Sequence, residues 1–202
     1  MLKIVLASRN RGKLAELKSL LKDLPVNLIP LDSYSQPPTP EETGVSFKEN
    51  AIIKAKAVAQ FTGEIALADD SGLEVEALGR KPGIFSSRYA GPQSSDEDNN
   101  RKLLAELKNV PREKRGASFV CALALVTTQG SQIVVEGRCR GEIGFQPKGS
   151  GGFGYDPLFI CRQGKTLAEL PPEIKNRISH RVQAARKLKR KLANLFSGGE
   201  LL

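Results

Sequence analysis

The sequence predicts an α/β protein with a mixed, twisted sheet flanked by helices. Residues 3–7 form a short apolar run that is followed by leucines at helical spacing, which is how α/β sheets commonly begin. Two long runs typical of strands, at 116–127 and 131–144, are separated only by Thr128-Gln129-Gly130, which indicates an antiparallel hairpin. With 202 residues, the chain is expected to form one domain, or one domain with two lobes.

The first half of the chain alternates strand and helix signals. Leucines at helical spacing predict a helix over 14–24, and a second short strand is expected at 28–29. The Pro-rich loop 35–44 follows, and then a helix from about Ser46 to Phe61, where Ser46 and Glu49 have the spacing of a capping box. The pattern favours parallel strand connections in this half.

The second half begins with a strand at 64–70 that is expected to end on Asp69 and Asp70, with a glycine turn after them. A helix with an acidic first turn is predicted at 95–108. A short strand at 158–160 follows the glycine-rich loop 149–157. The last helix starts near Ser179 and carries one apolar stripe, made of Val182, Ala185, Leu188, Leu192 and Leu195.

The net charge of +9 comes from one segment of the chain. Eight basic residues and no acidic one lie between Ile174 and Gly199, and the remaining charges nearly balance. Such a segment would bind phosphate in a salt-dependent way, so a nucleic-acid-binding module is the alternative from a different class. With 5% aromatic residues and no recognisable nucleic-acid motif, nucleic-acid binding is not expected, and a solvated helix face is favoured.

Targeting and redox features predict a cytoplasmic protein. Neither a secretory leader nor a membrane span is expected, because Met1-Leu2-Lys3 leads straight into a predicted strand and the longest apolar runs are only a few residues. The three cysteines are far apart and make no CxxC motif, which is typical of reduced thiols and argues against a zinc site.

The segment from Ser8 to Lys13 combines a hydroxyl, an amide and a lysine between a predicted strand and helix. Unpaired N–H groups and the helix dipole favour an anion at such a place. The alternative is a plain helix cap with a solvated lysine. The spacing of a P-loop is absent.

Two carboxylate pairs suggest a magnesium site. Glu41 and Glu42 precede one glycine turn, and Asp69 and Asp70, at the predicted end of a buried strand, precede another. Mg²⁺ prefers oxygen ligands and commonly takes one or two carboxylates together with phosphate oxygens. An acidic surface loop is the alternative for the glutamates, whereas a turn needs at most one of the two aspartates.

Two further segments carry weaker signals. Phe153 and Tyr155, set among glycines, could stack on a base, although aromatic residues beside glycines are most often core. His180, the only histidine, and Arg181 start the basic helix, where they could donate to carbonyl or phosphate oxygens or merely cap the helix.

Taken in order, these segments resemble the Ham1/inosine triphosphate pyrophosphatase family. The matching stretches run from Leu6 to Arg181 and are LASRNRGKLAEL, EETGVSFKENAIIKA, ALADDSGLEV, PGIFSSRYAG, GGFGYDPLF, KTLAEL and EIKNRISHR. The resemblance implies a two-lobed fold, usually dimeric, with a nucleotide cleft between the lobes. It also implies Mg²⁺-dependent hydrolysis of dITP, ITP and XTP to the monophosphate and pyrophosphate.

The resemblance further implies a role for individual residues. Asp70 is expected to accept the proton of the attacking water, Lys13 to offset charge on the phosphates, and Ser71 to contact substrate. The metal ligands are expected to be Asp70 with Glu41 or Glu42. The triphosphate is expected to be bound by Ser8, Arg9, Asn10, Arg11, Gly12 and Lys13. The purine is expected to be held by Phe153, Gly154, Tyr155, Asp156, Lys175, His180 and Arg181.

Overall fold

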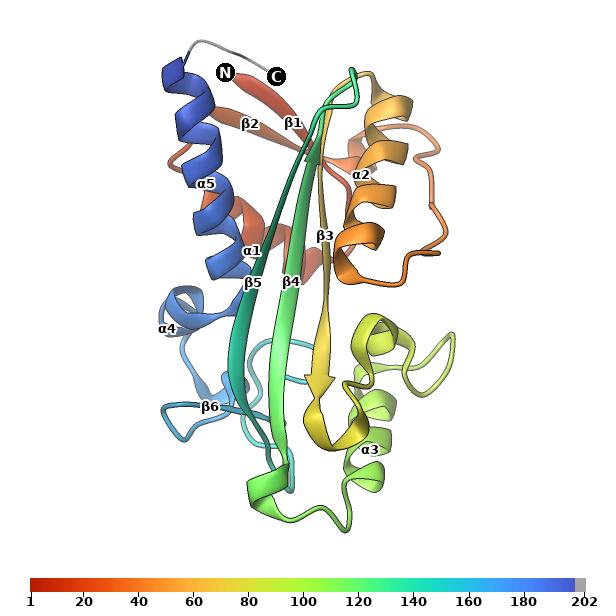
Figure 1. The fold of residues 1–202 in the computed structure, drawn as a ribbon, viewed down its shortest axis with the longest axis vertical. Helices are drawn as coiled ribbons and strands as arrows, with labels where there is room; N and C mark the ends of the chain where they lie inside the picture. The colour runs from red at the N-terminus through yellow and green to blue at the C-terminus, as the bar shows by residue number, and fades with distance from the viewer. Residues whose placement is uncertain (199–202) are drawn as a thin grey trace. The chain divides into compact units, whose positions relative to one another are not determined.

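A computed structural model describes the backbone of residues 1–198 and the side chains of residues 1–193. In this part of the chain, six strands form a sheet in the order β2-β1-β3-β4-β5-β6 (Figure 1). The strands are β1 (Leu2–Leu6), β2 (Val26–Pro30), β3 (Ile65–Val75), β4 (Gly116–Val126), β5 (Gln132–Ile143) and β6 (Phe159–Cys161). β1 pairs in parallel with β2 and β3, whereas β5 and β6 are antiparallel. The predicted mixed sheet is therefore confirmed.

The helices agree closely with the sequence pattern. They are α1 (Arg11–Leu21), α2 (Phe47–Thr62), α3 (Asp96–Glu106), α4 (Pro172–Ile178) and α5 (His180–Gly198). Ser46 caps α2 by accepting a hydrogen bond from the N–H of Glu49, but the Glu49 carboxylate bonds Val45 rather than the cap, so the predicted box is only half formed. The pattern did not predict α4, which starts at a proline, a residue tolerated in the first turn because the N–H there needs no helical partner.

Strand β3 is longer than predicted. The expected end at Asp70 and the glycine turn at Ser71-Gly72 are wrong, because the strand continues to Val75. Leu73 and Val75 are both fully buried, so the apolar pattern of a strand resumes beyond the two aspartates. Asp69 and Asp70 therefore lie within a strand, where successive side chains point to opposite faces.

The chain folds into two compact units. Unit 1 contains Met1–Asp70, Cys121–Gly137 and Arg181–Leu202, and unit 2 contains Ser71–Val120 and Arg138–His180. Strands β3, β4 and β5 each contribute residues to both units. In the described part of the chain, none of the helices is both long and apolar enough to cross a membrane.

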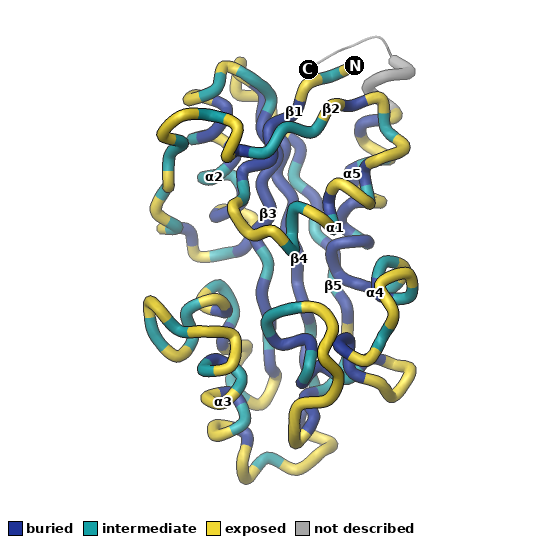
Figure 2. Tube along the Cα trace, turned by 180° about the vertical axis from the view of Figure 1, so that it is seen from behind, coloured by how far each residue is buried: buried dark blue, intermediate teal, exposed yellow. Residues whose placement is uncertain are grey.

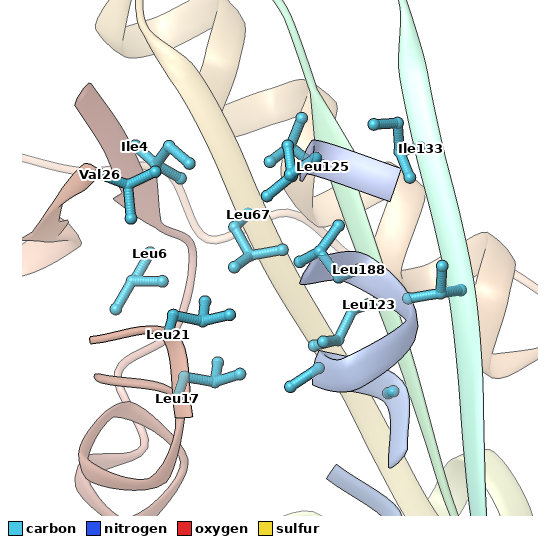
Figure 3. Packing of buried hydrophobic residues seen from close by; sticks show 14 of the residues in the cluster. Ile4, Leu6, Leu17, Leu21, Val26, Leu67, Leu123, Leu125, Ile133 and Leu188 are labelled. Carbon is cyan, nitrogen blue, oxygen red and sulfur yellow. The ribbon is translucent and has the colours of Figure 1, made fainter. Parts of the chain in front are cut away.

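In unit 1, α1 and α5 cover one face of the sheet and α2 covers the other (Figure 1). Leu17 and Leu21 of α1 and Leu188 of α5 point toward Leu67 and Leu123 of the strands (Figure 3). Four members of the predicted apolar stripe of α5 are buried, namely Val182, Ala185, Leu188 and Leu192, whereas the side chain of Leu195 lies outside the described residues. Burial of this stripe leaves the basic residues of α5 mostly at the surface.

In unit 2, Leu103 of α3 and Leu107, the residue that caps the end of this helix, pack into a second core with strand residues such as Leu73. Phe119 of β4 and Phe159 of β6 contact each other there, with ring centroids 4.7 Å apart. Figure 2 shows β3 and β4 buried along most of their length, while the helices keep exposed outer surfaces.

Candidate functional site

The turn that follows β1 carries the first predicted site residues. The side chain of Asn10 caps α1 by accepting a hydrogen bond from the N–H of Lys13 at 3.0 Å, and the Ser8 hydroxyl accepts one from the N–H of Asn10 at 3.2 Å. The guanidinium of Arg9 donates to the carbonyl of Pro37 at 3.0 Å. Asn10 is a helix cap, but the solvated lysine of the alternative is wrong, because the ammonium of Lys13 is 2.6 Å from the buried carboxylate of Asp69. Arg11 and Gly12 present the first N–H groups of the helix.

Asp69 lies at the centre of a buried ion cluster in unit 1. Its fully buried carboxylate is 2.6 Å from the ammonium of Lys13 and 2.8 Å from Nε of Arg181. Arg181 also pairs with Glu16, and the thiol of Cys121 donates to Asp69 at 3.2 Å. Burial alone would raise the pKa of Asp69, but the two cations hold it well below its usual value. Asp69 therefore stays ionised and holds two basic side chains in place.

Asp70 belongs to a different ion cluster. Its carboxylate is 2.6 Å from the ammonium of Lys54, a residue of α2, and the same ammonium is 2.9 Å from Glu42. Burial raises the pKa of Asp70, an effect that Lys54 opposes and the nearby Glu42 reinforces. A carboxylate whose pKa is raised in this way is suited to accept a proton.

Lys54 is the functional candidate that the sequence reading missed. A signal was present, because helical spacing places Lys54 on the same face of α2 as Phe47, Ala51 and Val58, which are all buried. A lysine on a buried helix face needs an anionic partner. The pattern could have indicated that Lys54 has an anionic partner, but not which residue that partner is.

The structure distinguishes the two glutamates of the loop before α2. Glu42 shares the ammonium of Lys54 with Asp70, whereas Glu41 is exposed. Among the described residues, no group of three or more His, Cys, Asp or Glu side chains could hold a metal ion. A metal bound by Glu42 and Asp70 would therefore need further oxygens from a ligand or from water, which is the usual arrangement for Mg²⁺.

Unit 2 brings together three of the predicted purine-binding residues. The ammonium of Lys175 is 2.8 Å from the buried carboxylate of Asp156 and 5.0 Å from the centre of the Phe153 ring. The same carboxylate accepts the N–H of Phe153 at 3.0 Å. At Gly152, with φ at 78°, an added Cβ would lie 2.0 Å from that carboxylate, so only glycine fits. A buried charge pair thus lies beside a partly exposed aromatic ring.

The other predicted residues lie in more closed surroundings. The Tyr155 ring is part of the core of unit 2, and its hydroxyl donates to the carbonyl of Ser86 at 2.8 Å. The N–H of Gly154 donates to Asp96 at 2.6 Å. His180 is buried and stacks on Phe119, with ring centroids 4.8 Å apart.

Two of the predicted substrate contacts stay predictions on this geometry. Ser71 is a partly exposed residue of β3 in unit 2. Arg181 is only 1% exposed, and its guanidinium binds Asp69 and Glu16 in unit 1. To fulfil the expected purine-binding role, Arg181 would have to bind a ligand in addition to these two carboxylates.

Comparison with protein families identifies a match along nearly the whole chain. The model of the Ham1 family matches residues 4–191. A protein of Geobacter sulfurreducens named dITP/XTP pyrophosphatase is 50% identical over 190 residues, which cover 94% of this chain and 96% of that protein. A protein of the same name from Methylococcus capsulatus is 49% identical and covers 97% of this chain and 98% of its own length.

Solved structures give the same result. A HAM1 protein from Coxiella burnetii superimposes with a TM-score of 0.88 at 47% identity, covering 96% of this chain and all of that one. The Ham1 protein of Staphylococcus aureus gives a TM-score of 0.85 at 41% identity, with 95% of this chain and 98% of that chain covered. The fold described above is thus that of these proteins.

Proposed function

Because this chain belongs to the Ham1 family, we propose that it hydrolyses the triphosphates of non-standard purines, namely dITP, ITP and XTP, to the monophosphate and pyrophosphate. The observation that carries this function is the match to relatives named dITP/XTP pyrophosphatase, at 50% and 49% identity over nearly the whole chain. The ion clusters around Asp69 and Asp70 provide groups suited to this chemistry.

We propose that the turn between β1 and α1 binds the triphosphate. A triphosphate carries about four negative charges, which suits a helix N-terminus flanked by a lysine. The ammonium of Lys13 is already held near Asp69, so its position is fixed before a substrate arrives. Ser8, Arg9, Asn10, Arg11 and Gly12 would surround the phosphates, with the N–H groups of the first turn as donors.

Asp70 is proposed as the general base. The oxygen of a water molecule forms a bond to the α-phosphorus, the bond to the bridging oxygen breaks, and the electron pair leaves with pyrophosphate. The proton of the water passes to the Asp70 carboxylate, whose pKa is raised by burial. Lys13 would offset the negative charge that builds up on the phosphate oxygens during this step.

Glu42 and Asp70 are proposed to hold Mg²⁺ together with phosphate oxygens. Their carboxylates fit this role because both lie within 2.9 Å of one ammonium, so the site already has room for one shared cation. Mg²⁺ would supply charge neutralisation at the phosphates. Glu41, which is exposed, is the weaker of the two predicted glutamate ligands.

The purine is proposed to be recognised by residues of unit 2, with Lys175, Asp156 and Phe153 as the main group and Gly154, Tyr155 and His180 near them in the sequence. Hypoxanthine and xanthine carry a 6-keto oxygen that accepts a hydrogen bond, whereas adenine presents a donor at this position. A protein group that donates a hydrogen bond at this position would face the 6-amino group of adenine, which is also a donor. Such a mismatch discriminates strongly against adenine nucleotides. His180 is the predicted donor among these residues of unit 2, and Arg181, the second predicted donor, belongs to unit 1.

Two further properties are proposed, the first from the family resemblance and the second from the targeting and redox features of the sequence. The protein is expected to form a homodimer, which light scattering after size-exclusion chromatography would test. It is also expected to act in the cytoplasm, where the nucleotide pool is located. Neither property enters the chemical scheme above.

Pyrophosphate release from ITP, XTP, dITP, ATP, GTP and dUTP in the presence of Mg²⁺ tests the proposed function. We expect rapid release from the first three nucleotides and slow release from the others. A preference for dUTP would indicate a pyrophosphatase with a different pocket. Filter binding of nucleic acid at two salt concentrations, combined with no hydrolysis of any nucleotide, would favour the nucleic-acid-binding alternative instead.

A further inference from the structure

Lys54 has an unusual charge environment on the buried face of α2. Its ammonium lies 2.6 Å from Asp70 and 2.9 Å from Glu42, so one positive charge serves two negative ones. The side chains of Lys54 and Asp70 are only 15% and 9% exposed. In such surroundings, water screens the repulsion between the two carboxylates poorly, and the ammonium offsets this repulsion.

The loop that carries Glu42 is fastened to the same helix. Asn50, one turn before Lys54, is fully buried, and its side-chain oxygen accepts the N–H of Gly44 at 2.8 Å. The carboxylate of Glu49 accepts the N–H of Val45 at 2.9 Å. An added Cβ at Gly44 would lie 2.7 Å from the Asn50 oxygen, so the loop can approach the helix this closely only with glycine. Helix α2 therefore positions both the ammonium and one of its two carboxylate partners.

We propose that Lys54 is a positioning residue that serves as the resident counterion of Glu42 and Asp70. Its ammonium occupies the point where the two carboxylates converge, so a divalent cation binds the nucleotide-free protein only by displacing it. This inference rests on the proposed function for the identity of the cation. Lys54 thereby keeps the two carboxylates assembled while also weakening their affinity for a metal.

The consequence is that metal binding and substrate binding are coupled. When the ammonium leaves the carboxylates, it needs another anion, because an unpaired buried charge is costly. A triphosphate that arrives with its metal supplies such an anion, whereas a metal alone does not. The nucleotide-free protein is therefore expected to bind divalent cations weakly, and removal of the ammonium should strengthen this binding.

Titration of the nucleotide-free protein with Mn²⁺, followed by the electron paramagnetic resonance signal of the free ion, tests the proposal without any turnover. Lys54→Met should bind Mn²⁺ about tenfold more tightly than the wild type, because a competing charge is gone. Lys56→Met is the matched control, because Lys56 lies on the same helix and is exposed. It should bind Mn²⁺ as the wild type does. Equal or weaker binding by Lys54→Met would overturn the proposal.

Thermal unfolding provides a second measurement. In metal-free buffer, Lys54→Met should unfold at a lower temperature than the wild type, since its two carboxylates repel each other. Mn²⁺ should raise its unfolding temperature more than that of the wild type. The double variant K54M/D70N removes the repulsion and should regain stability in metal-free buffer, so the comparison holds even if the single variant folds poorly. If K54M/D70N is no more stable than Lys54→Met, the counterion role is wrong.

Failure of this inference and failure of the proposed function give different results. Pyrophosphate release from ITP by the wild type reports on the function, whereas Mn²⁺ affinity of the nucleotide-free variants reports on Lys54. If the wild type hydrolyses ITP but Lys54→Met binds Mn²⁺ no more tightly than the wild type, only the counterion role of Lys54 is rejected. Tighter Mn²⁺ binding in a protein that hydrolyses no nucleotide would reject only the function.

Discussion

The two faces of strand β3 hold neighbouring aspartates in opposite electrostatic states. Asp69 is fully buried between Lys13 and Arg181, and these two cations lower its pKa strongly. Asp70 faces Lys54, which it shares with Glu42, and burial raises its pKa. For Asp69, the attraction of Arg181 and Lys13 together outweighs the effect of burial, whereas for Asp70 burial outweighs the attraction of Lys54 and Lys13. One aspartate therefore organises the site, and the other is available for proton transfer.

The largest effect expected from this contrast concerns activity. Asp70→Asn should lower kcat for ITP about 10³-fold, because a general base contributes on this scale. The fold should persist, since Lys54 keeps its ion pair with Glu42. Steady-state pyrophosphate release, with circular dichroism as the folding check, measures both properties. Asp23→Asn, an exposed aspartate of unit 1, is the control and should match the wild type. Wild-type turnover in Asp70→Asn would remove this residue from the mechanism.

The next effect concerns stability and belongs to Asp69. Asp69→Asn leaves the buried Arg181 and the ammonium of Lys13 without their shared carboxylate. Breaking a buried charge pair on one side should lower the free energy of unfolding by about 3 kcal/mol. Urea denaturation at neutral pH measures this value, and Asp70→Asn should lose much less. Equal losses in the two variants would contradict the distinction drawn between them.

The pH dependence of stability sharpens the same contrast. The folded-state pKa of Asp69 is lowered, so its contribution is complete above its unfolded pKa and is lost as the pH falls through the lower folded value. Below about pH 4, the free energy of unfolding of the wild type should therefore fall by about 2 kcal/mol more than that of Asp69→Asn. The raised pKa of Asp70 has the opposite sign, because the folded state binds that proton more tightly. Urea denaturation at a series of pH values from 7 into the acid range measures this difference. If Asp69 were not responsible for it, the free energy of unfolding would change with pH in the same way for the wild type and Asp69→Asn.

The smallest expected effect concerns Cys121, which donates its thiol to Asp69 at 3.2 Å. Cys121→Ala removes this weak donor and little volume, so the free energy of unfolding should fall by about 1 kcal/mol. Activity on ITP should be nearly unchanged, since Lys13 and Arg181 still hold the carboxylate. A loss comparable to that of Asp69→Asn would mean that the thiol, rather than the two cations, dominates the cluster.

Local patterns in the sequence predicted most of the fold. Asn10, Ser46 and Ser95 all cap helices, because the short polar side chain that serves the cap is adjacent in sequence to the N–H groups it binds. The hairpin between β4 and β5 turns at the expected residues, where the N–H of Thr127 donates to the carbonyl of Ser131. The continuation of β3 was missed because Ser71-Gly72 resembles a turn, although buried leucine and valine follow it.

The candidate site was only partly predictable, because its ion pairs join distant parts of the chain. Arg181 lies 112 residues from Asp69, and no local spacing links them. The guanidinium of Arg181 binds two carboxylates in the structure, which the resemblance did not indicate, and its role toward the purine stays a prediction. Lys54 of α2 was missed for the same reason, since its partners lie on a loop and on strand β3. Residue type and period indicate which side chains are buried, but the choice of partner depends on tertiary packing.

The products of ITP hydrolysis test the central claim most directly. Phosphorus NMR of ITP incubated with the wild type and Mg²⁺ separates the two possible cleavages of the triphosphate. Our account predicts the simultaneous appearance of inosine monophosphate and pyrophosphate, and a spectrum with Asp70→Asn in which ITP persists. Formation of inosine diphosphate and inorganic phosphate, or unchanged ITP with the folded wild type, would contradict it.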